Sequence, residues 1–402
     1  MRVLVIGGGL AGGAAALAAR KAGASVGIVA GRAGASALGS GAYDLGGWRR
    51  GSGDRTPIPA DLRELLEQAG AHIVVEDATV ATSAGVLRGC RARDLQVLAI
   101  GEVGVSLIVP RVPLLGWDAD AIASSLDEQL RARSSGNARA VDATLHKRLE
   151  EARLPLAELA RLHDDPARRG WLAARLREAA ARAGNATAIL LPPILGADPA
   201  TCEAVRAEVG IPLGEVIGEP GGVAALRFFR LRDRCLGAAS IDVIEGEVSS
   251  VREGGARIGD RVVAADRIVL AIGGITAGGL RYVTSEHDMG SDGAPVVPAP
   301  PVTCTVVIER ADDESPVSLH VDGAPLDAPG SLAGADPGPM LLGPAPGLVS
   351  VGLPVDETGV VLDRGGKPVR WLFAAGEVVA DGARTGLGAI ASGMRAGREA
   401  AR

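Results

Sequence analysis

The chain has 402 residues, enough to bury a large hydrophobic core and to divide into two lobes. Its formal net charge of −6 argues against a general nucleic-acid surface, so we expect no nucleic-acid partner. The cysteines form no C-x-x-C pair, which argues against a zinc site, a thioredoxin-like motif or an iron–sulfur cluster held by this chain alone. We interpret them as buried, reduced thiols of a cytoplasmic protein. They are Cys90, Cys202, Cys235 and Cys304.

The first thirty residues predict a strand–turn–helix–strand unit. Residues 3–6 are a short apolar run typical of a parallel strand buried on both faces, and a G-x-G-x-x-G motif follows at residues 7–12. Residues 11–22 are rich in helix formers, and residues 26–29 form a second apolar run. Glycines at this turn allow a tight bend, close approach of a phosphate and close packing of helix on strand. The unit therefore predicts a phosphate site at the helix N-terminus, unless the glycines only shape the turn.

The glycine motif in a strand–turn–helix–strand unit is typical of dinucleotide-binding proteins, but one part of that pattern is missing here. The second strand normally ends in Asp or Glu, which binds the adenosine ribose, but here the chain reads Val29-Ala30-Gly31-Arg32. The sequence thus supports a phosphate site more strongly than an ordinary adenosine-ribose site.

The middle of the chain predicts loops, short strands and helices. Residues 33–53 are rich in glycine and serine, which is typical of a loop. We expect helices at 60–69, 118–131 and 168–183 and strands at 72–75, 82–92 and 94–110. The Arg- and Ala-rich stretch between 131 and 168 has little strand character and fits a helical lobe inserted between sheet segments.

The C-terminal part predicts a sheet. Residues 241–274 alternate short strands with glycine turns, as in a β-meander, and end in a buried strand that enters glycines at 268–274. Residues 291–347 are rich in Pro, Gly and Asp and predict irregular loops. A last strand at 371–376 precedes a small-residue helix. Alternate arginines at 227–234 would share one strand face, as an anion site or a salt-bridged surface. No sequence repeat is apparent.

Three strands therefore run into glycines, at residues 3–12, 268–274 and 371–376. Open α/β sheets bind ligands beyond the carboxyl ends of their strands. This arrangement resembles the flavoprotein disulfide-reductase and fumarate-reductase superfamily. The resemblance implies that the first element holds the phosphates, the second crosses behind them, and FAAGE…GLGAIASG at 373–393 meets the isoalloxazine. Glu377 then corresponds to an acid near the ribityl hydroxyls, and the helix start near 388–391 points its positive end at the flavin O2 region.

Four further segments resemble the anaerobic glycerol-3-phosphate dehydrogenase B family. They are residues 37–45 (ALGSGAYDL), 82–91, 105–123 (VSLIVPRVPLLGWDADAIA) and 191–196 (LPPILG). The resemblance implies FMN as the favoured flavin, with FAD as the alternative. It also implies a catalytic FAD subunit and an iron–sulfur membrane-anchor subunit as partners, so that any attachment to the inner membrane runs through a partner. FMN has no adenosine, which would explain the absence of a carboxylate at Ala30.

The expected fold is α/β: a Rossmann-like three-layer domain of the FAD/NAD(P)-binding kind, with a β-meander and an inserted α+β cap lobe. We expect the flavin-binding domain to be discontinuous, with residues 1–115, 226–285 and 346–402. Residues 116–225 and 286–345 would form the cap, or substrate, lobe.

The candidate flavin-binding residues lie on the three glycine elements and on the loop after the second strand. They are Gly7, Gly9, Leu10, Ala11, Gly12, Ala30, Arg32, Ser40, Gly41, Gly273, Gly274, Gly376, Glu377, Gly388, Ala389 and Ile390. His287 and Arg384 are the candidate catalytic residues, because a hydride-transferring flavoenzyme needs an acid or base and cations for an acidic substrate. His287 could instead be a surface histidine and Arg384 a solvated loop arginine. No metal site is expected.

The leading interpretation is a flavin-dependent oxidoreductase of this glycerol-3-phosphate dehydrogenase kind. It would oxidise a small-molecule substrate, glycerol 3-phosphate, to dihydroxyacetone phosphate, or relay the electrons of that reaction to a quinone-linked chain. One alternative is a stand-alone FAD-dependent dehydrogenase or reductase of the fumarate-reductase kind. A second alternative is a non-catalytic electron-transfer subunit whose flavin is structural.

Overall fold

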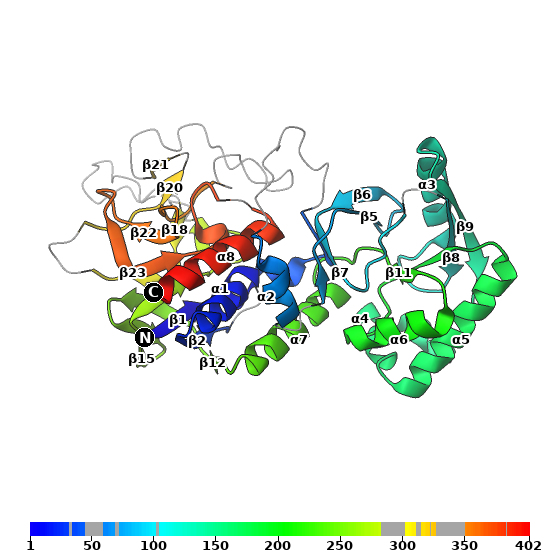
Figure 1. Cartoon of the computed structure of the whole chain (residues 1–402), viewed down its shortest axis with the longest axis horizontal. Helices are drawn as coiled ribbons and strands as arrows, with labels where there is room; N and C mark the ends of the chain where they lie inside the picture. Colours follow the sequence, from blue (N-terminus) through cyan, green and yellow to red (C-terminus); the bar gives the residue numbers. More distant parts are fainter. Residues whose placement is uncertain are drawn as a thin grey trace, which may run out of the picture. The chain divides into compact units, whose positions relative to one another are not determined.

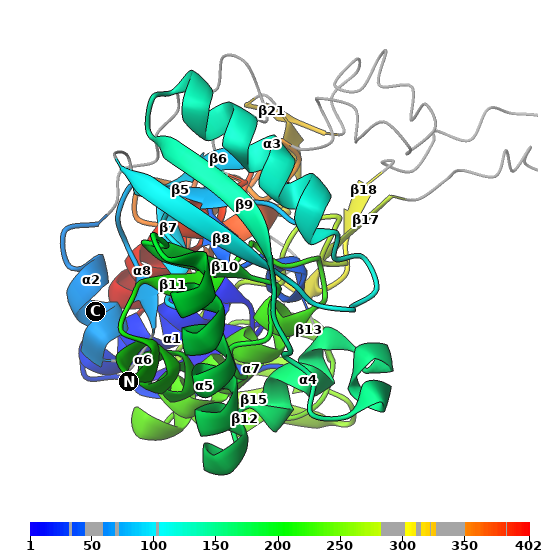
Figure 2. The same ribbon diagram turned by 90° about the vertical axis from the view of Figure 1, so that its right-hand side faces the viewer.

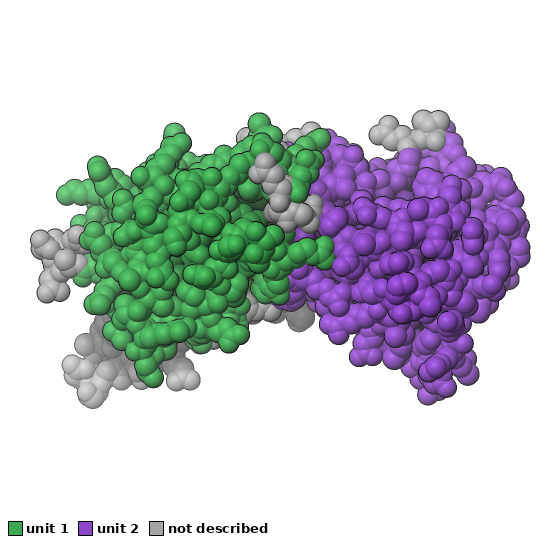
Figure 3. Space-filling model, turned by 60° about the horizontal axis from the view of Figure 1, so that its bottom comes forward, with its two compact units in different colours: residues 1–36, 56–69, 232–402 green, residues 37–55, 70–231 purple. Residues whose placement is uncertain are grey.

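A computed structural model describes residues 1–31, 34–44, 59–68, 72–101, 104–282, 302–310, 315–321, 323–326, 350–382 and 384–402. The chain forms two compact units, which Figure 3 shows in different colours. Unit 1 comprises residues 1–36, 56–69 and 232–402, and unit 2 comprises residues 37–55 and 70–231. These bounds differ from those of the domains expected from the sequence, whose division by function stays a prediction.

Unit 1 is built on a six-stranded sheet. Its strands in spatial order are β12 (Asp242–Ile244), β2 (Ser25–Val29), β1 (Arg2–Ile6), β16 (Arg267–Leu270), β23 (Pro368–Ala374) and β22 (Val360–Leu362). The first five strands are parallel, and β22 pairs antiparallel with β23 at the edge. The predicted strands 3–6, 26–29, 268–274 and 371–376 are therefore all present and adjacent.

Apolar residues alternate along β1 to cover both faces of this sheet. Val3 and Val5 pack with the helices α1 (Leu10–Lys21) and α8 (Gly386–Ala400), which lie side by side in Figure 1. Leu4 and Ile6 face the opposite core, where a smaller sheet covers them. Unit 1 thus has three layers: two helices, a parallel sheet and a second β-layer.

The second β-layer contains the expected meander. Its strands are β13 (Val248–Arg252), β14 (Gly255–Ile258) and β15 (Arg261–Ala264), which pair antiparallel, and β19 (Val307–Ile308), which pairs parallel with β13. Two antiparallel pairs follow: β17 (Leu280–Tyr282) with β18 (Val302–Cys304), and β20 (His320–Val321) with β21 (Ala324–Pro325). Unit 1 also contains α2 (Leu62–Gln68) and the 3-10 helices η1 (Ala35–Leu38, whose last two residues belong to unit 2) and η5 (Gly376–Val378).

Unit 2 contains a separate, wholly parallel sheet. Its spatial order is β11 (Leu213–Glu215), β10 (Ala188–Leu191), β8 (Val105–Arg111) and β9 (Gly136–Asp142). Helix α3 (Ala119–Ala132) covers one face, and α5 (Pro166–Ala183) and α6 (Pro199–Val209) cover the other (Figure 2). The helices expected at 118–131 and 168–183 are confirmed.

Short elements complete unit 2. One sheet joins β3 (Ala42–Tyr43), β7 (Ala92–Asp94) and β4 (Ile73–Val74), and β5 (Ala78–Ala81) pairs with β6 (Leu87–Cys90). The segment between β9 and α5 carries the 3-10 helix η2 (Leu149–Arg153) and α4 (Leu156–Leu162). Helix α7 (Val223–Ala238) begins in unit 2 and ends in unit 1.

Two expectations about elements are wrong. The arginines at 227–234 lie on helix α7 rather than on a strand, because apolar residues at helical spacing, such as Val223 and Leu236, are buried there. The stretch between 131 and 168 does contain a strand, β9, whose pairing with β8 outweighs the weak strand preference of GNARAVD. Among the described helices, none combines the length and the apolar character needed to cross a membrane.

Candidate functional site

The glycine motif forms a turn so tight that side chains are excluded at two positions. Gly7 has φ +115°, its N–H donates to the Val29 carbonyl oxygen at 2.9 Å, and a Cβ would lie 2.2 Å from the Ala271 oxygen. A Cβ on Gly12 would lie only 1.7 Å from the Gly7 carbonyl oxygen. The close contact of helix and strand predicted for this turn is therefore present, and it tolerates only glycine.

The N-terminus of α1 is capped from outside the motif. Gly9 is the N-cap residue and has no side chain, but the Ser36 hydroxyl on η1 accepts a hydrogen bond from the Leu10 N–H at 2.9 Å. A Cβ on Gly9 would lie 3.0 Å from that same oxygen. An oxygen acceptor is thus held against the positive end of α1, in the kind of position where helix N-termini bind phosphate oxygens.

A guanidinium lies beside the residue that replaces the expected carboxylate. A Cβ on Gly8 would lie 2.7 Å from the Ala30 Cβ and 3.2 Å from the Arg232 Nη1. Arg232 is largely buried, and it forms an ion pair with Asp233 at 2.7 Å. The end of β2 therefore has a cation in place of an anion, which suits a negatively charged ligand group.

The three predicted strand ends meet, because β1, β16 and β23 are consecutive in the sheet. At the end of β16, a Cβ on Gly274 would lie 3.1 Å from the Cβ of Glu377. At the end of β23, a Cβ on Gly376 would lie 2.8 Å from the Cβ of Ala11 on α1. Gly273, with φ +77°, turns the chain after β16. Residues far apart in the sequence thus surround one end of the sheet.

The turn after β23 is held by two side chains. The Gly376 N–H donates to the Ser392 hydroxyl oxygen on α8 at 2.9 Å, and that hydroxyl donates to the Ala389 carbonyl oxygen at 3.0 Å. The Arg384 guanidinium donates to the backbone oxygens of Glu377 and, at 2.9 Å, of Val351. Burial lowers the pKa of Arg384 below its ordinary value, although the carboxylates of Glu377 and Asp381 oppose this. Arg384 therefore positions the backbone after β23.

Helix α8 begins at this turn. Thr385 is its N-cap, and the Thr385 side chain accepts a hydrogen bond from the Gly388 N–H at 3.1 Å. Gly388, Ala389 and Ile390 form the first turns of the helix, whose N-terminal end carries positive charge. These residues lie where the sequence predicted a helix start, and their contact with a flavin stays a prediction.

Four candidates remain to be placed. Arg32 and His287 lie outside the described residues. Ser40 and Gly41 belong to unit 2, where the Ser40 carbonyl oxygen accepts from the Gly218 N–H at 2.8 Å. Gly41 has φ +86°, and its carbonyl oxygen accepts from the Asp94 N–H at 2.7 Å.

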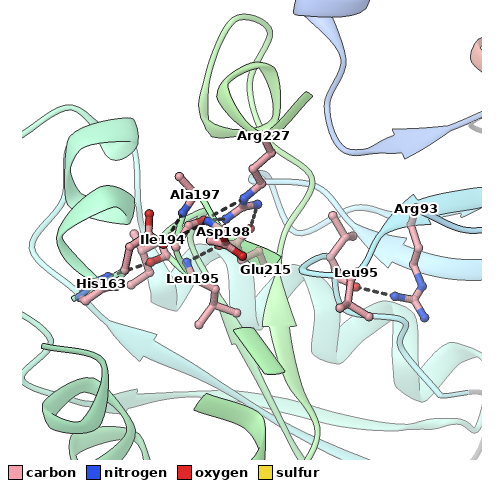
Figure 4. Close-up of polar contacts among 12 residues, drawn as sticks. Arg93, Leu95, His163, Ile194, Leu195, Ala197, Asp198, Glu215 and Arg227 are labelled. Atoms are coloured by element: carbon pink, nitrogen blue, oxygen red, sulfur yellow. Dashed lines mark hydrogen bonds and ion pairs between the residues drawn. The ribbon is translucent and has the colours of Figure 1, made fainter. Parts of the chain in front are cut away.

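Unit 2 holds a cluster of ionisable groups near these two residues. Arg227 forms a two-pronged ion pair with Glu215, at 2.5 and 2.8 Å, and both side chains are buried (Figure 4). The Tyr43 hydroxyl donates to Asp94 at 3.1 Å. Burial raises the pKa of Asp94 to about 6, while the charge of Arg227 opposes this, and burial raises the pKa of Tyr43 as well.

Sequence patterns did not single out several residues of these sites. Ser36 and Ser392 each cap a turn from a distant segment, and no local motif marks such a contact. Asp94 and Glu215 belong to no sequence motif. Only the fold shows that Asp94 lies close to Tyr43 and Glu215 close to Arg227. Within the described residues, no group of three or more His, Cys, Asp or Glu could hold a metal ion.

The groups around α1 fit the phosphates of a flavin nucleotide. Gly8 and Gly9 present backbone without a side chain, the helix end provides N–H donors, of which that of Leu10 is bonded to Ser36, and Arg232 provides a nearby cation. These features suit an anionic group such as a phosphate.

A comparison with known protein families finds a match that includes the glycine turn and α1. Residues 2–88, less than a quarter of the chain, match the family model described as an FAD binding domain. No curated protein sequence matches the chain.

Several solved structures are similar at low identity. Putrescine oxidase bound to putrescine is 19% identical over 68% of this chain and 58% of its own, with a TM-score of 0.23. The 3-ketosteroid Δ1-dehydrogenase of Sterolibacterium denitrificans is 13% identical over 99% and 98%, with a TM-score of 0.34. A flavocytochrome c3 fumarate reductase is 14% identical over 100% and 77%, with a TM-score of 0.33. The chain thus spans 58% of the length of putrescine oxidase.

Proposed function

We propose that the chain is a flavin-dependent oxidoreductase that binds FAD through unit 1. The observation that carries the proposal is the meeting of three glycine-ended strands, β1, β16 and β23, beside the N-terminus of α1. The match of residues 2–88 to an FAD binding domain supports FAD in particular. It does not support the preference for FMN that Ala30 suggested.

Bound FAD would supply a ring that accepts and returns a hydride. The chain's own residues bind and orient it. The N–H groups at the start of α1 bind phosphate, and Arg232 adds positive charge near Ala30. Ser392 and Arg384 fix the backbone at Gly376 and Glu377, so that the start of α8 stays in place. A proton-transferring group stays unassigned, because His287 lies outside the described residues.

The substrate is proposed from resemblance alone. The segments 37–45, 82–91, 105–123 and 191–196 favour glycerol 3-phosphate as substrate, with a catalytic FAD subunit and an iron–sulfur anchor as partners. A stand-alone enzyme of the fumarate-reductase kind is the second candidate, and the unbroken set of three strand ends within one chain favours it. Bleaching of the flavin by glycerol 3-phosphate in the isolated chain would support the first candidate. Bleaching by other substrates only would support the second.

The cofactor is tested by purifying the protein, releasing its chromophore by heat and separating it chromatographically. FAD is the expected product. FMN would restore the interpretation of Ala30 as the mark of a mononucleotide, and a colourless protein that takes up neither flavin would contradict the proposal.

The glycine turn offers a matched pair of variants for the same proposal. In Gly12→Ala the new methyl group would overlap the Gly7 oxygen, so we expect loss of most bound flavin and a lower unfolding temperature. Gly13→Ala adds a methyl group with nothing within 4 Å, so it should keep its flavin and gain up to about 1 kcal/mol of helix stability. Absorbance of the flavin and thermal unfolding measure both effects. Equal flavin content in the two variants would contradict a phosphate site at this turn.

A further inference from the structure

The parallel sheet of unit 2 has a topology that creates a ligand-binding position of its own. Its order, β9-β8-β10-β11, means that the chain moves from β8 to β9 on one side and then returns to place β10 on the other side of β8. The connection after β8 runs to α3 on one face, and the connection after β10 runs to α6 on the other face. In such sheets ligands bind outside the carboxyl ends of the two strands where the direction reverses. Here these strands are β8 and β10.

The two loops at this reversal share a sequence pattern. Residues 113–118 read PLLGWD and residues 193–198 read PILGAD, so the chain does contain a short repeat, contrary to expectation. The glycines have nearly equal φ angles of +77° at Gly116 and +79° at Gly196. Asp118 and Asp198 are the N-caps of α3 and α6, and each side chain accepts a backbone N–H. Two equivalent turns therefore leave the sheet toward opposite faces.

A tryptophan lies between the two faces at this point. Trp117 packs against the core beneath α3 and also against the core beneath α5 and α6. Its indole N–H donates to the Pro110 carbonyl oxygen at 2.8 Å, which fixes the ring beside the end of β8. The loops after β8, β9 and β10 meet in one core, because Leu114, Leu145 and Ile194 all belong to it.

Buried polar atoms without partners gather at the same place. His163 is fully buried, and its Nδ1 donates to the Ile194 carbonyl oxygen at 2.8 Å, just after β10 (Figure 4). Since a carbonyl oxygen can only accept, Nδ1 carries the proton and Nε2 is a free acceptor. Within the described residues Nε2 has no partner, and neither ring nitrogen of His146 nor the Nε of Arg168 has one.

These groups are joined through Glu151, which pairs with the Arg168 guanidinium and accepts the N–H of Lys147, the neighbour of His146, at 2.8 Å. The charges of Glu151, Arg168 and His146 all act on His163, and burial lowers the pKa of His163 to about 4, so its ring is neutral near pH 7. Burial also lowers the pKa of His146. Arg168 forms a buried ion pair with Glu151 and stacks on Trp171 at 4.4 Å. The cluster has no net charge, and it offers two donors and two acceptors that are otherwise unmatched.

We propose that unit 2 binds a small, uncharged, hydroxyl-bearing molecule at the reversal between β8 and β10, with His146, His163 and Arg168 as its hydrogen-bonding groups. A hydroxyl group donates and accepts, so neighbouring hydroxyls can satisfy all four atoms, each of which is costly to leave unpaired when buried. The charges of Glu151 and Arg168 cancel, so the cluster offers neither an anion nor a cation an unpaired opposite charge. The site lies within unit 2 and does not depend on the flavin proposal.

The test uses the full chain and the ring nitrogens of its five histidines, which are few enough to resolve by nitrogen-15 NMR. The probes are erythritol, erythronate and putrescine, four-carbon molecules that are respectively neutral, anionic and cationic. We expect erythritol to shift the His146 and His163 signals saturably below about 100 mM, and the charged probes to bind about tenfold more weakly. No shift with erythritol, or equal shifts with erythronate, would overturn the proposal.

Two variants separate binding from folding. His163→Asn keeps a donor for the Ile194 oxygen and removes Nε2, so the erythritol shift of His146 should weaken about tenfold. His72→Asn makes the same change elsewhere in unit 2 and should leave the shift unaltered. An unchanged shift in His163→Asn would contradict the proposal. If that variant does not fold, the wild-type titration still decides. Flavin content, recorded on each sample, tests the proposed function separately.

Discussion

Two groups of unit 2, the fully buried His163 and the partly buried Asp94, titrate in the same pH range with opposite effects on stability. His163 has its pKa lowered from 6.5 to about 4 by burial, so the folded state resists its protonation. Its contribution to stability is fully present above pH 6.5 and is lost as the pH falls toward 4. Asp94 has its pKa raised from 3.8 to about 6, so its contribution is present below pH 3.8 and is lost as the pH rises through 6. The two effects oppose each other.

We therefore expect the stability of unit 2 to change little between about pH 4 and 6, because the two contributions cancel. A variant that removes one group should reveal the pH dependence of stability that the other group causes. In Asp94→Asn, acidification over this range should lower the free energy of unfolding by up to about 3 kcal/mol, through His163. In His163→Asn, acidification should raise it by up to about 3 kcal/mol, through Asp94. Pulsed hydrogen exchange of β8 and β10 peptides in a urea series measures both. Parallel pH profiles for the two variants would contradict these assignments.

The ion pair between Glu215 and Arg227 is the most deeply buried charge contact described in unit 2. Arg227→Met would leave the Glu215 carboxylate buried without its cation, so we expect a loss of about 3–5 kcal/mol in the free energy of unfolding. The double variant with Glu215→Met should recover most of that loss, since no buried charge remains.

Arg111→Met is the matched surface control. Arg111 pairs with Asp120 and Asp142 at the exposed end of β8, where water competes for all three groups. Urea unfolding should show almost no change for this variant. A similar loss for Arg111→Met and Arg227→Met would mean that burial of the charge is not what matters.

At the scale of elements, helices α1 and α8 approach each other backbone to backbone. A Cβ on Gly393 would lie 2.1 Å from the Ala11 oxygen, and a Cβ on Gly397 would lie 2.2 Å from the Ala15 oxygen. The two glycines are four residues apart and so lie on one face of α8. The sequence predicted a small-residue helix here, but the reason for its small residues is visible only in the packing.

Gly397→Ala should push the two helices apart and destabilise unit 1 by about 1–3 kcal/mol, despite the better helix propensity of alanine. Thermal unfolding of the purified protein measures this effect. Gly237→Ala on α7 is the control, because it is exposed and meets nothing within 4 Å, and it should stabilise by up to about 1 kcal/mol. If both variants were destabilised, the cause would be the replacement of a helix glycine itself rather than the contact between α1 and α8.

The whole molecule consists of two compact units with separate parallel sheets. The residues proposed above to bind the flavin come mainly from unit 1. A ligand that binds only the folded state stabilises the unit that holds it. FAD at about one hundred times its Kd should raise the free energy of unfolding of unit 1 by about 2.7 kcal/mol.

Hydrogen exchange of β1 and β16 peptides, with and without FAD, measures that rise, and β8 and β10 peptides report unit 2. We expect protection in the first pair and little change in the second. Protection confined to β8 and β10 would place the flavin in unit 2 and overturn the proposed location.

The strand–turn–helix–strand unit at residues 2–29 follows from the amino-acid sequence alone. Glycine spacing, apolar runs and helix formers act over a few residues, so strand, turn and helix follow from backbone sterics and nearby hydrogen bonds. The folded structure was needed to show that β1 lies beside β16 and β16 beside β23, that Ser36 and Arg232 reach the glycine turn, and that β9 forms a strand at all. Those outcomes depend on pairing and packing between segments far apart in the chain, where the energy of the whole core outweighs local preference.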